Sequence, residues 1–215
     1  MNLPFTIEQF LNVFAEYNQA VWPFQIVLNL FALSAIILCF KKVKPGDKIN
    51  SGILAFLWLW IGMVYHIMHF TSINKAAYVF GIVFILQGIV FIYAGILRDY
   101  LSFNFSVSLY SVTGAIFILY ALIVYPIVGH QLGHVYPQSP TFGLPCPTTI
   151  FTFGILLFTD KRIPKYVLII PFLWSLIGFS AAVNLSVYED FGLVVAGVLG
   201  ILFIYLRDRK FKQSK

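Results

Sequence analysis

The chain has 215 residues, of which 60% are hydrophobic, 18% aromatic and only 10% charged. A soluble domain carries about 25% charged residues, so this composition excludes a soluble globule and predicts an integral membrane protein. The formal net charge of +6 does not indicate nucleic-acid binding, because the distribution of the basic residues is explained by membrane topology.

Residues 1–20, MNLPFTIEQFLNVFAEYNQA, predict a short amphipathic helix lying in the membrane interface, because apolar residues recur near helical spacing with polar residues between them. Thr6, with Gln9 three residues later, matches a capping box. Trp22 and Pro23 mark the entrance of the chain into the bilayer, since tryptophan favours the headgroup zone.

Seven apolar segments follow, and they predict seven transmembrane helices in one all-α membrane domain over 1–215. A span needs roughly 17–25 residues, and only the fifth segment, with about fourteen, falls clearly short. The fifth segment is expected to tilt little, to lie in a thinned patch of bilayer, or to begin below the surface after a re-entrant loop. The segments are 22–40, 52–71, 77–97, 107–128, 146–159, 166–187 and 191–206.

The basic residues predict the orientation of these segments. If the N-terminus is outside, every Lys and Arg except Lys75 falls in a cytoplasmic loop or in the basic tail 207–215. Short cytoplasmic loops are enriched in Lys and Arg. Omitting the fifth span would place the run DKRIPK outside, so the charges support that short segment. The prediction is an outside N-terminus and a cytoplasmic C-terminus.

The longest polar interruption is 129–149, GHQLGHVYPQSPTFGLPCPTT, which predicts an ordered extracytoplasmic loop. Its four prolines fix backbone angles and remove donors. Thr148 and Thr149 follow at a helix start, where free N–H groups favour an anion or a polar substrate. The alternative is a rigid plug that covers the fifth span.

All four histidines fall on the predicted outer side. His66 and His69 are three residues apart, and His130 and His134 are four apart, so each pair is expected to share a helical face if the helix continues. Cys146, at a helix start that favours the thiolate, could join them. Imidazole and thiolate ligands suit zinc, copper or haem, so these five residues are the predicted metal ligands.

Further residues are predicted to line the same pocket or to orient the histidine rings, as carboxylates and hydroxyls commonly do around metal-bound histidine. They are Glu16, Tyr17, Tyr65, Tyr136, Thr148, Thr149, Asn184, Glu189 and Asp190. Three alternatives stay open: each histidine is an interfacial residue bonded to a carbonyl or water, Cys146 is a small packing residue, and the two acidic residues cap the last span.

Two stretches, MNLPFTIEQFLNVFAEYNQAVWP and PTFGLPCPTTIFTFGILL, together with the seven spans, resemble a bacterial multi-pass membrane family catalogued only as a domain of unknown function. The resemblance covers essentially the whole chain. It implies a location in the bacterial inner (cytoplasmic) membrane and supplies neither an activity nor a site.

The leading functional hypothesis is an extracytoplasmic His/Cys-lined pocket that binds or transports a transition metal or a small solute. The first alternative is a membrane-embedded metalloenzyme or haem redox protein that uses the same histidines. The second is a structural or accessory membrane subunit with no site of its own. Catalysis and oligomeric state are left open, and the expected partners are the lipid bilayer and the metal ion or solute, with no nucleic acid.

Overall fold

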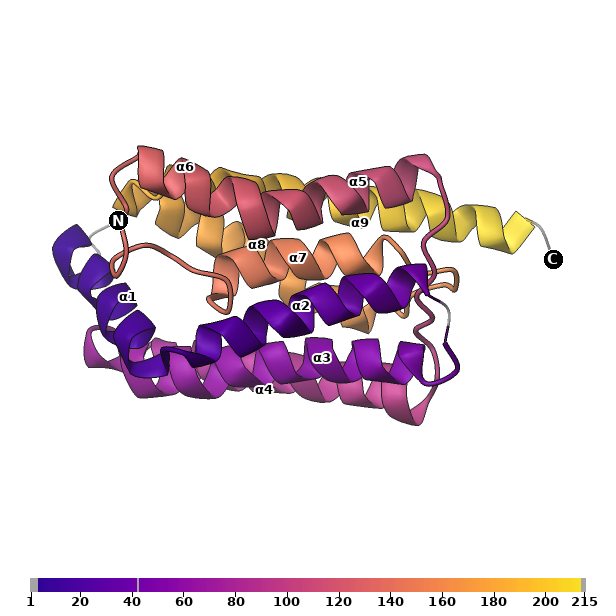
Figure 1. The fold of residues 1–215 in the computed structure, drawn as a ribbon, viewed down its shortest axis with the longest axis horizontal. Coiled ribbons are helices and arrows are strands. Elements are labelled where there is room, and N and C mark those ends of the chain that lie inside the picture. Colours follow the sequence, from indigo (N-terminus) through magenta and orange to yellow (C-terminus); the bar gives the residue numbers. More distant parts are fainter. Residues whose placement is uncertain (1–3, 42, 214–215) are drawn as a thin grey trace.

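The computed structural model describes residues 4–41 and 43–213, with side chains up to Lys210. The predictions made for residues 1–3, for Lys42 and for the end of the basic tail lie outside this described part. Its regular structure is helical, apart from two isolated β-bridges, and this confirms the all-α prediction (Figure 1).

Nine α-helices follow in chain order, and shorter helical segments extend several of them. The α-helices are α1 (Ile7–Val21), α2 (Phe24–Phe40), α3 (Gly46–Trp60), α4 (Ala77–Phe91), α5 (Leu109–Leu119), α6 (Tyr125–Gln131), α7 (Pro145–Leu156), α8 (Tyr166–Leu185) and α9 (Phe191–Gln213) in the described chain. The π-helical segments are η1 (Ile61–His69), η3 (Ile92–Leu97) and η4 (Tyr120–Val124), and the 3-10 segments are η2 (Phe70–Ser72) and η5 (Tyr188–Asp190).

Several helices are long and apolar enough to cross a membrane. In the described chain five pass this criterion alone, and the pair α1 and α2, bent by 87°, would make a sixth. The five are Gly46–Ser72, Ala77–Leu97, Leu109–Gln131, Tyr166–Leu185 and Tyr188–Lys210. Aliphatic side chains such as Leu30, Ile116 and Ile169 are about half exposed on their outer faces, where lipid can cover them. The structure therefore agrees with a multi-pass membrane protein.

Helix α1 begins with the predicted capping box. The Thr6 hydroxyl accepts a hydrogen bond from the Gln9 backbone N–H (3.2 Å), and the Gln9 side chain accepts one from the Thr6 N–H (2.9 Å). The sharp bend before α2 turns α1 across one end of the bundle (Figure 1). Its buried side includes Phe14 and Tyr17, so its apolar face packs on the bundle.

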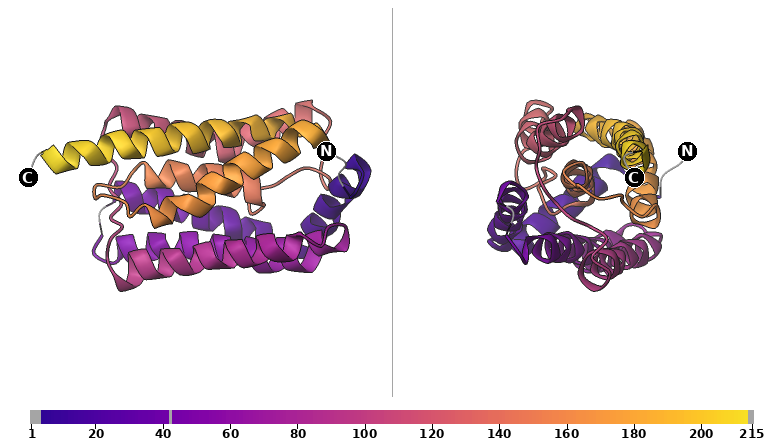
Figure 2. Two further views of the ribbon diagram at one scale, coloured as in Figure 1. Left: turned by 180° about the vertical axis from the view of Figure 1, so that it is seen from behind. Right: turned by 90° about the vertical axis from the view of Figure 1, so that its right-hand side faces the viewer.

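Helix α7 lies at the centre of the bundle. Viewed along the bundle, it lies in the centre with the other helices around it (Figure 2). Every residue of α7 except Cys146 is buried. Trp58 of α3 donates to Thr152 (3.0 Å), and Arg207 of α9 donates to the Leu156 carbonyl at the C-terminus of α7 (3.0 Å). These hydrogen bonds pair polar groups that lipid tails could not pair, because the tails neither donate nor accept hydrogen bonds.

The two ends of the bundle differ in composition. The end called here the α1 end carries α1, the α6–α7 loop (132–144) and η5 (Figure 1). The opposite end, called the basic end, carries the α2–α3, α4–α5 and α7–α8 loops and the last turns of α9. Its described basic residues are Lys41, Lys44, Lys48, Arg98, Lys161, Arg162, Lys165, Arg207, Arg209 and Lys210.

Candidate functional site

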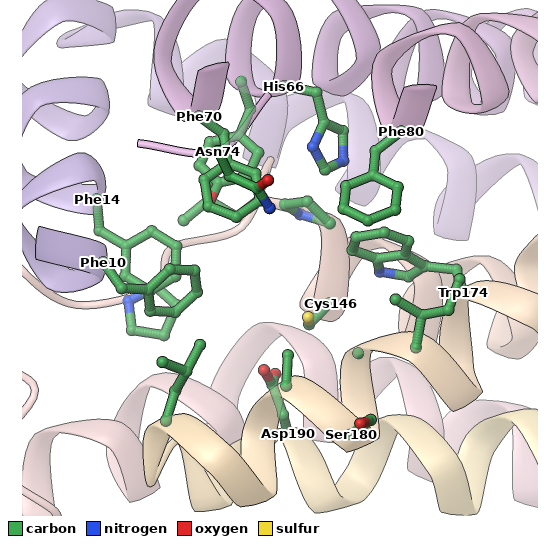
Figure 3. Close-up of a pocket in the computed structure, with 18 of the residues that line it drawn as sticks. Phe10, Phe14, His66, Phe70, Asn74, Phe80, Cys146, Trp174, Ser180 and Asp190 are labelled. Carbon is green, nitrogen blue, oxygen red and sulfur yellow. The ribbon is translucent and has the colours of Figure 1, made fainter. Parts of the chain in front are cut away.

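A cavity of about 330 Å³ lies inside the α1 end of the bundle (Figure 3). Its walls come from α1, η1, η2, α4, α6, the α6–α7 loop, α7, α8 and η5, and they are mostly apolar and aromatic. The polar and titratable side chains among the lining residues are Tyr65, His66, Asn74, Tyr125, Cys146, Ser180, Asn184 and Asp190.

His66 is the most unusual residue of the wall. Its side chain is fully buried, and neither ring nitrogen has a hydrogen-bond partner among the described residues. Aromatic rings surround it, with centroids at 4.7 Å for Phe84, 5.2 Å for Trp174 and 5.8 Å for Phe80. A buried polar group without a partner costs roughly 1–3 kcal/mol. The free nitrogens at the cavity therefore mark a position where a ligand would gain a hydrogen bond.

Asp190 and Cys146 form the polar part of the facing wall. In Figure 3 Asp190 lies across the hollow from His66, with Cys146 between them in this view. The buried Asp190 carboxylate accepts a hydrogen bond from the Tyr125 hydroxyl and also interacts with the Cys146 thiol. Cys146 lies in the first turn of α7, as the sequence predicts.

Side-chain hydrogen bonds fasten the α6–α7 loop to α1 and α2. The Asn18 amide donates to the carbonyls of Pro137 (2.7 Å) and Ser139 (2.8 Å). Gln25 donates to Thr141 (3.1 Å). These contacts hold the loop over the N-terminus of α7, so the loop both covers that helix and closes one side of the cavity.

His69 does not share a face with His66. The prediction assumed α-helical spacing, but both residues lie in η1, where i→i+5 hydrogen bonds widen the turn. The His69 ring bonds to the Val64 carbonyl (2.8 Å) and meets the Tyr17 ring edge-on. It lines a separate surface depression together with Trp22.

His130 and His134 do not share a face either. Helix α6 ends at Gln131, and Gly133 has a φ of +93°, so the helix does not continue between the two histidines. His130 is exposed. His134 instead pairs with the buried Glu189 carboxylate at 2.7 Å.

The predicted metal ligands thus lie in separate places. His66 and Cys146 line the cavity, and the other three histidines do not. Within residues 4–41 and 43–213, no group of three His, Cys, Asp or Glu side chains could hold a metal ion. The cavity itself combines mostly apolar walls with a few polar groups.

Three of the additional predicted pocket residues, Tyr65, Asn184 and Asp190, line the cavity. The other six do not line it. Tyr17 donates to the Gly143 carbonyl (3.2 Å), Thr148 accepts from the Gly143 N–H (3.3 Å), Thr149 donates to the Pro145 carbonyl (2.8 Å), Glu189 pairs with His134, Glu16 is exposed and Tyr136 is half exposed.

The aromatic wall of the cavity is not evident from the sequence. Phe10 and Phe14, which lie in the segment that the sequence predicts as an interfacial helix, line the cavity. Trp174 of α8 lines it too. The aromatic content of 18% was a signal, but rings that face lipid and rings that face a cavity look alike in a sequence.

A family model described as "Family of unknown function (DUF6064)" matches residues 7–215. The match covers almost the whole chain and confirms the expected resemblance to an uncharacterised family. No curated protein and no solved structure matches the chain at a significant level.

Proposed function

Because the chain belongs to this family of unknown function, we propose a function from the geometry of the cavity alone. The protein binds a small, mainly apolar molecule, and a hydrogen-bonding group of that molecule meets His66. The observation that carries the proposal is the fully buried His66 ring at the cavity wall, with no partner for either nitrogen in the described chain.

The size and chemistry of the cavity support this ligand class. Small-molecule sites have volumes of roughly 300–1,000 Å³, apolar and aromatic walls and a few placed polar groups. The cavity, at about 330 Å³, is at the small end of this range. Aromatic walls favour a flat ring, because offset and edge-to-face contacts add about 0.5–1.5 kcal/mol per pair. A compact ring-bearing molecule with one or two polar substituents fits best.

The exposure of the lining residues supports a lateral opening. Ile177, Ser180 and Asn184 of α8 line the cavity and are also exposed on the outer surface of the bundle. Asn74, after η2, lines it as well and is partly exposed. An apolar molecule dissolved in the outer part of the bilayer would reach His66 between these two segments without crossing water.

The threading belongs to the same proposal. The chain crosses a bacterial inner membrane seven times, and the fifth crossing combines the α6–α7 loop with α7. The 12 residues of α7 span about 18 Å, less than the hydrocarbon core of about 30 Å, and the loop supplies the remaining depth. The basic end faces the cytoplasm, as the positive-inside rule requires, so the cavity opens on the extracytoplasmic side.

Variants of the cavity test the proposal. We expect mild-detergent preparations of the wild-type protein to release one small apolar molecule per chain on solvent extraction, measured by mass spectrometry. Ala181→Phe places a ring in the volume that the ligand would occupy and should reduce this yield at least about tenfold, because overpacking costs about 1–3 kcal/mol. Val183→Phe is the matched control, since Val183 lies on the outer face of the same helix and does not line the cavity.

His66→Leu separates binding from folding. It should lose the bound molecule but keep or raise the melting temperature of the empty protein, because it removes an unpaired buried polar group. No extracted molecule in the wild type, and no shift of melting temperature with any apolar ring compound tested, would reject the proposal. Metal analysis and a visible spectrum of the same preparation test the alternatives: one zinc or copper per chain, or a Soret band, would replace the apolar ligand by a metal or haem.

A further inference from the structure

A second depression, of about 550 Å³, lies at the basic end between α8 and α9. It is called here the α8–α9 groove. Basic residues form its rim and apolar residues form its floor. The rim residues are Arg162, Lys165 and Arg209, and the floor includes Ile169, Phe172 and Ile201.

The rim keeps its positive charge. Arg162, Lys165 and Arg209 are exposed. The carboxylate at the groove, Asp208, is already engaged, because it accepts hydrogen bonds from the Arg207 guanidinium (2.9 and 3.1 Å) and from the Ile163 backbone N–H (3.0 Å). The Asp208 charge is thus directed to Arg207, and the rim presents a positive surface to a ligand.

The groove has the layered chemistry of a phospholipid. Ile169 follows Lys165 by one helical turn along α8, about 6 Å deeper, and Phe172 follows about 10 Å deeper. Ile169 is about half exposed, although it lies beside a charged rim. The guanidinium of Arg209 lies 5.8 Å from the centre of the Tyr205 ring, which orients it at the edge of the groove. Charge therefore lies at the rim and apolar surface lies below it.

We propose that the α8–α9 groove binds one anionic phospholipid of the adjacent leaflet. The lipid phosphate meets Arg162, Lys165 and Arg209, and one acyl chain lies over Ile169 and Phe172. Arginine and lysine bind phosphate by charge-assisted hydrogen bonds, and basic side chains next to a bilayer attract anionic lipid. The site is separate from the His66 cavity, so it does not depend on the proposed cavity ligand.

Native mass spectrometry of the full chain with added phosphatidylglycerol or phosphatidylcholine tests the proposal. We expect one phosphatidylglycerol to remain bound and phosphatidylcholine to bind at least about tenfold more weakly. Arg162→Gln/Lys165→Gln should weaken phosphatidylglycerol binding by more than about tenfold, at roughly fivefold per side chain. The matched control is Lys41→Gln/Lys44→Gln, which removes the same charge from the same end but outside the groove.

Two results would overturn the proposed lipid site. An equal loss in both double variants would overturn the proposal and leave only a general surface potential. Competition by glycerol phosphate as strong as by the intact lipid would also overturn it, because the apolar floor would then contribute nothing. Phe172→Ala gives an independent measurement: it should weaken a long-chain phosphatidylglycerol more than a short-chain one. Melting temperatures of all variants establish that each is folded.

Discussion

At the residue scale, a buried pair joins His134 of the α6–α7 loop to Glu189 of η5 at the α1 end of the bundle. The Glu189 side chain is fully buried, and one of its oxygens lies 2.7 Å from His134 Nδ1. Gly129 makes this position possible, because a Cβ there would lie 2.9 Å from the same carboxylate oxygen. The pair therefore ties the segment after α6 to the segment before α9.

His134→Ala is expected to destabilise the folded protein by about 3 kcal/mol, because removing one member of a buried pair leaves the Glu189 carboxyl buried without its partner. His130→Ala is the matched control, since His130 is exposed four residues earlier; its free energy of unfolding should change by less than about 0.5 kcal/mol. Denaturation in detergent, followed by circular dichroism, measures both. Adding Glu189→Gln to His134→Ala should restore part of the loss. Equal effects of the two alanine variants would contradict this account.

The sequence identifies several residues of the cavity, but it does not predict which of them lie next to one another. His66, Cys146 and Asp190 were candidates, and all three line the cavity. Their proposed companions failed for a geometric reason: the HxxH spacing places two rings together in an α-helix, but not in a π-helical segment. Nothing in the sequence of 61–69 distinguishes these two helices. The unpaired state of His66 also depends on residues from other helices and could only be seen in three dimensions.

At the element scale, α7 occupies the centre of the bundle because glycine lets it approach α5 closely. A Cβ on Gly114 would lie 2.6 Å from the Gly154 carbonyl oxygen, and a Cβ on Gly154 would lie 2.8 Å from the Gly114 carbonyl oxygen. The backbones of α5 and α7 are therefore in direct contact at this crossing. Small residues at such crossings are typical of helix packing in membranes, where close approach provides the van der Waals contact that drives association.

Gly154→Ala is therefore expected to destabilise the protein by about 1–3 kcal/mol, since the clash is with a backbone atom and with Ile118 and can be relieved only by moving a helix. Gly52→Ala provides the control. The nearest atom to its new Cβ would be Ile96 Cδ1 at 3.9 Å, an ordinary contact, and alanine favours the helix by up to about 1 kcal/mol. Thermal unfolding in detergent should thus move in opposite directions for the two variants. A loss of the same size in both would mean that close approach to α5 is not the cause.

The helices could be predicted from the sequence, but their neighbours could not. Each apolar segment is helical, and the capping box of Thr6 and Gln9 forms as expected. The sequence does not predict the central position of α7. A helix that is apolar all round is buried in a soluble protein, but in a bilayer the same pattern fits a helix facing lipid, because lipid tails are as apolar as a protein core. The short length of the segment was the only available signal.

At the scale of the whole molecule, the two ends carry different chemistry. Each described connection at the basic end contains Lys or Arg, whereas the α1 end contains the α6–α7 loop and the buried Glu189–His134 pair. The positive-inside rule concerns loops of this length close to the spans. The basic loops gather at one end of the bundle, and under the proposed threading this end faces the cytoplasm.

Cysteine labelling tests this orientation directly. The native thiols are poor reporters, because Cys39 is fully buried and Cys146 lines the cavity, so both are first replaced by alanine. Gln131→Cys, at the exposed end of α6, and Lys44→Cys, in the exposed α2–α3 loop, then place one thiol at each end. A membrane-impermeant maleimide should label Gln131→Cys in intact cells and Lys44→Cys only after the membrane is opened. Labelling of Lys44→Cys alone in intact cells would invert the threading and place the His66 cavity on the cytoplasmic side. Labelling of both positions in intact cells would mean that the two ends of the bundle share one face, against an odd number of crossings between them.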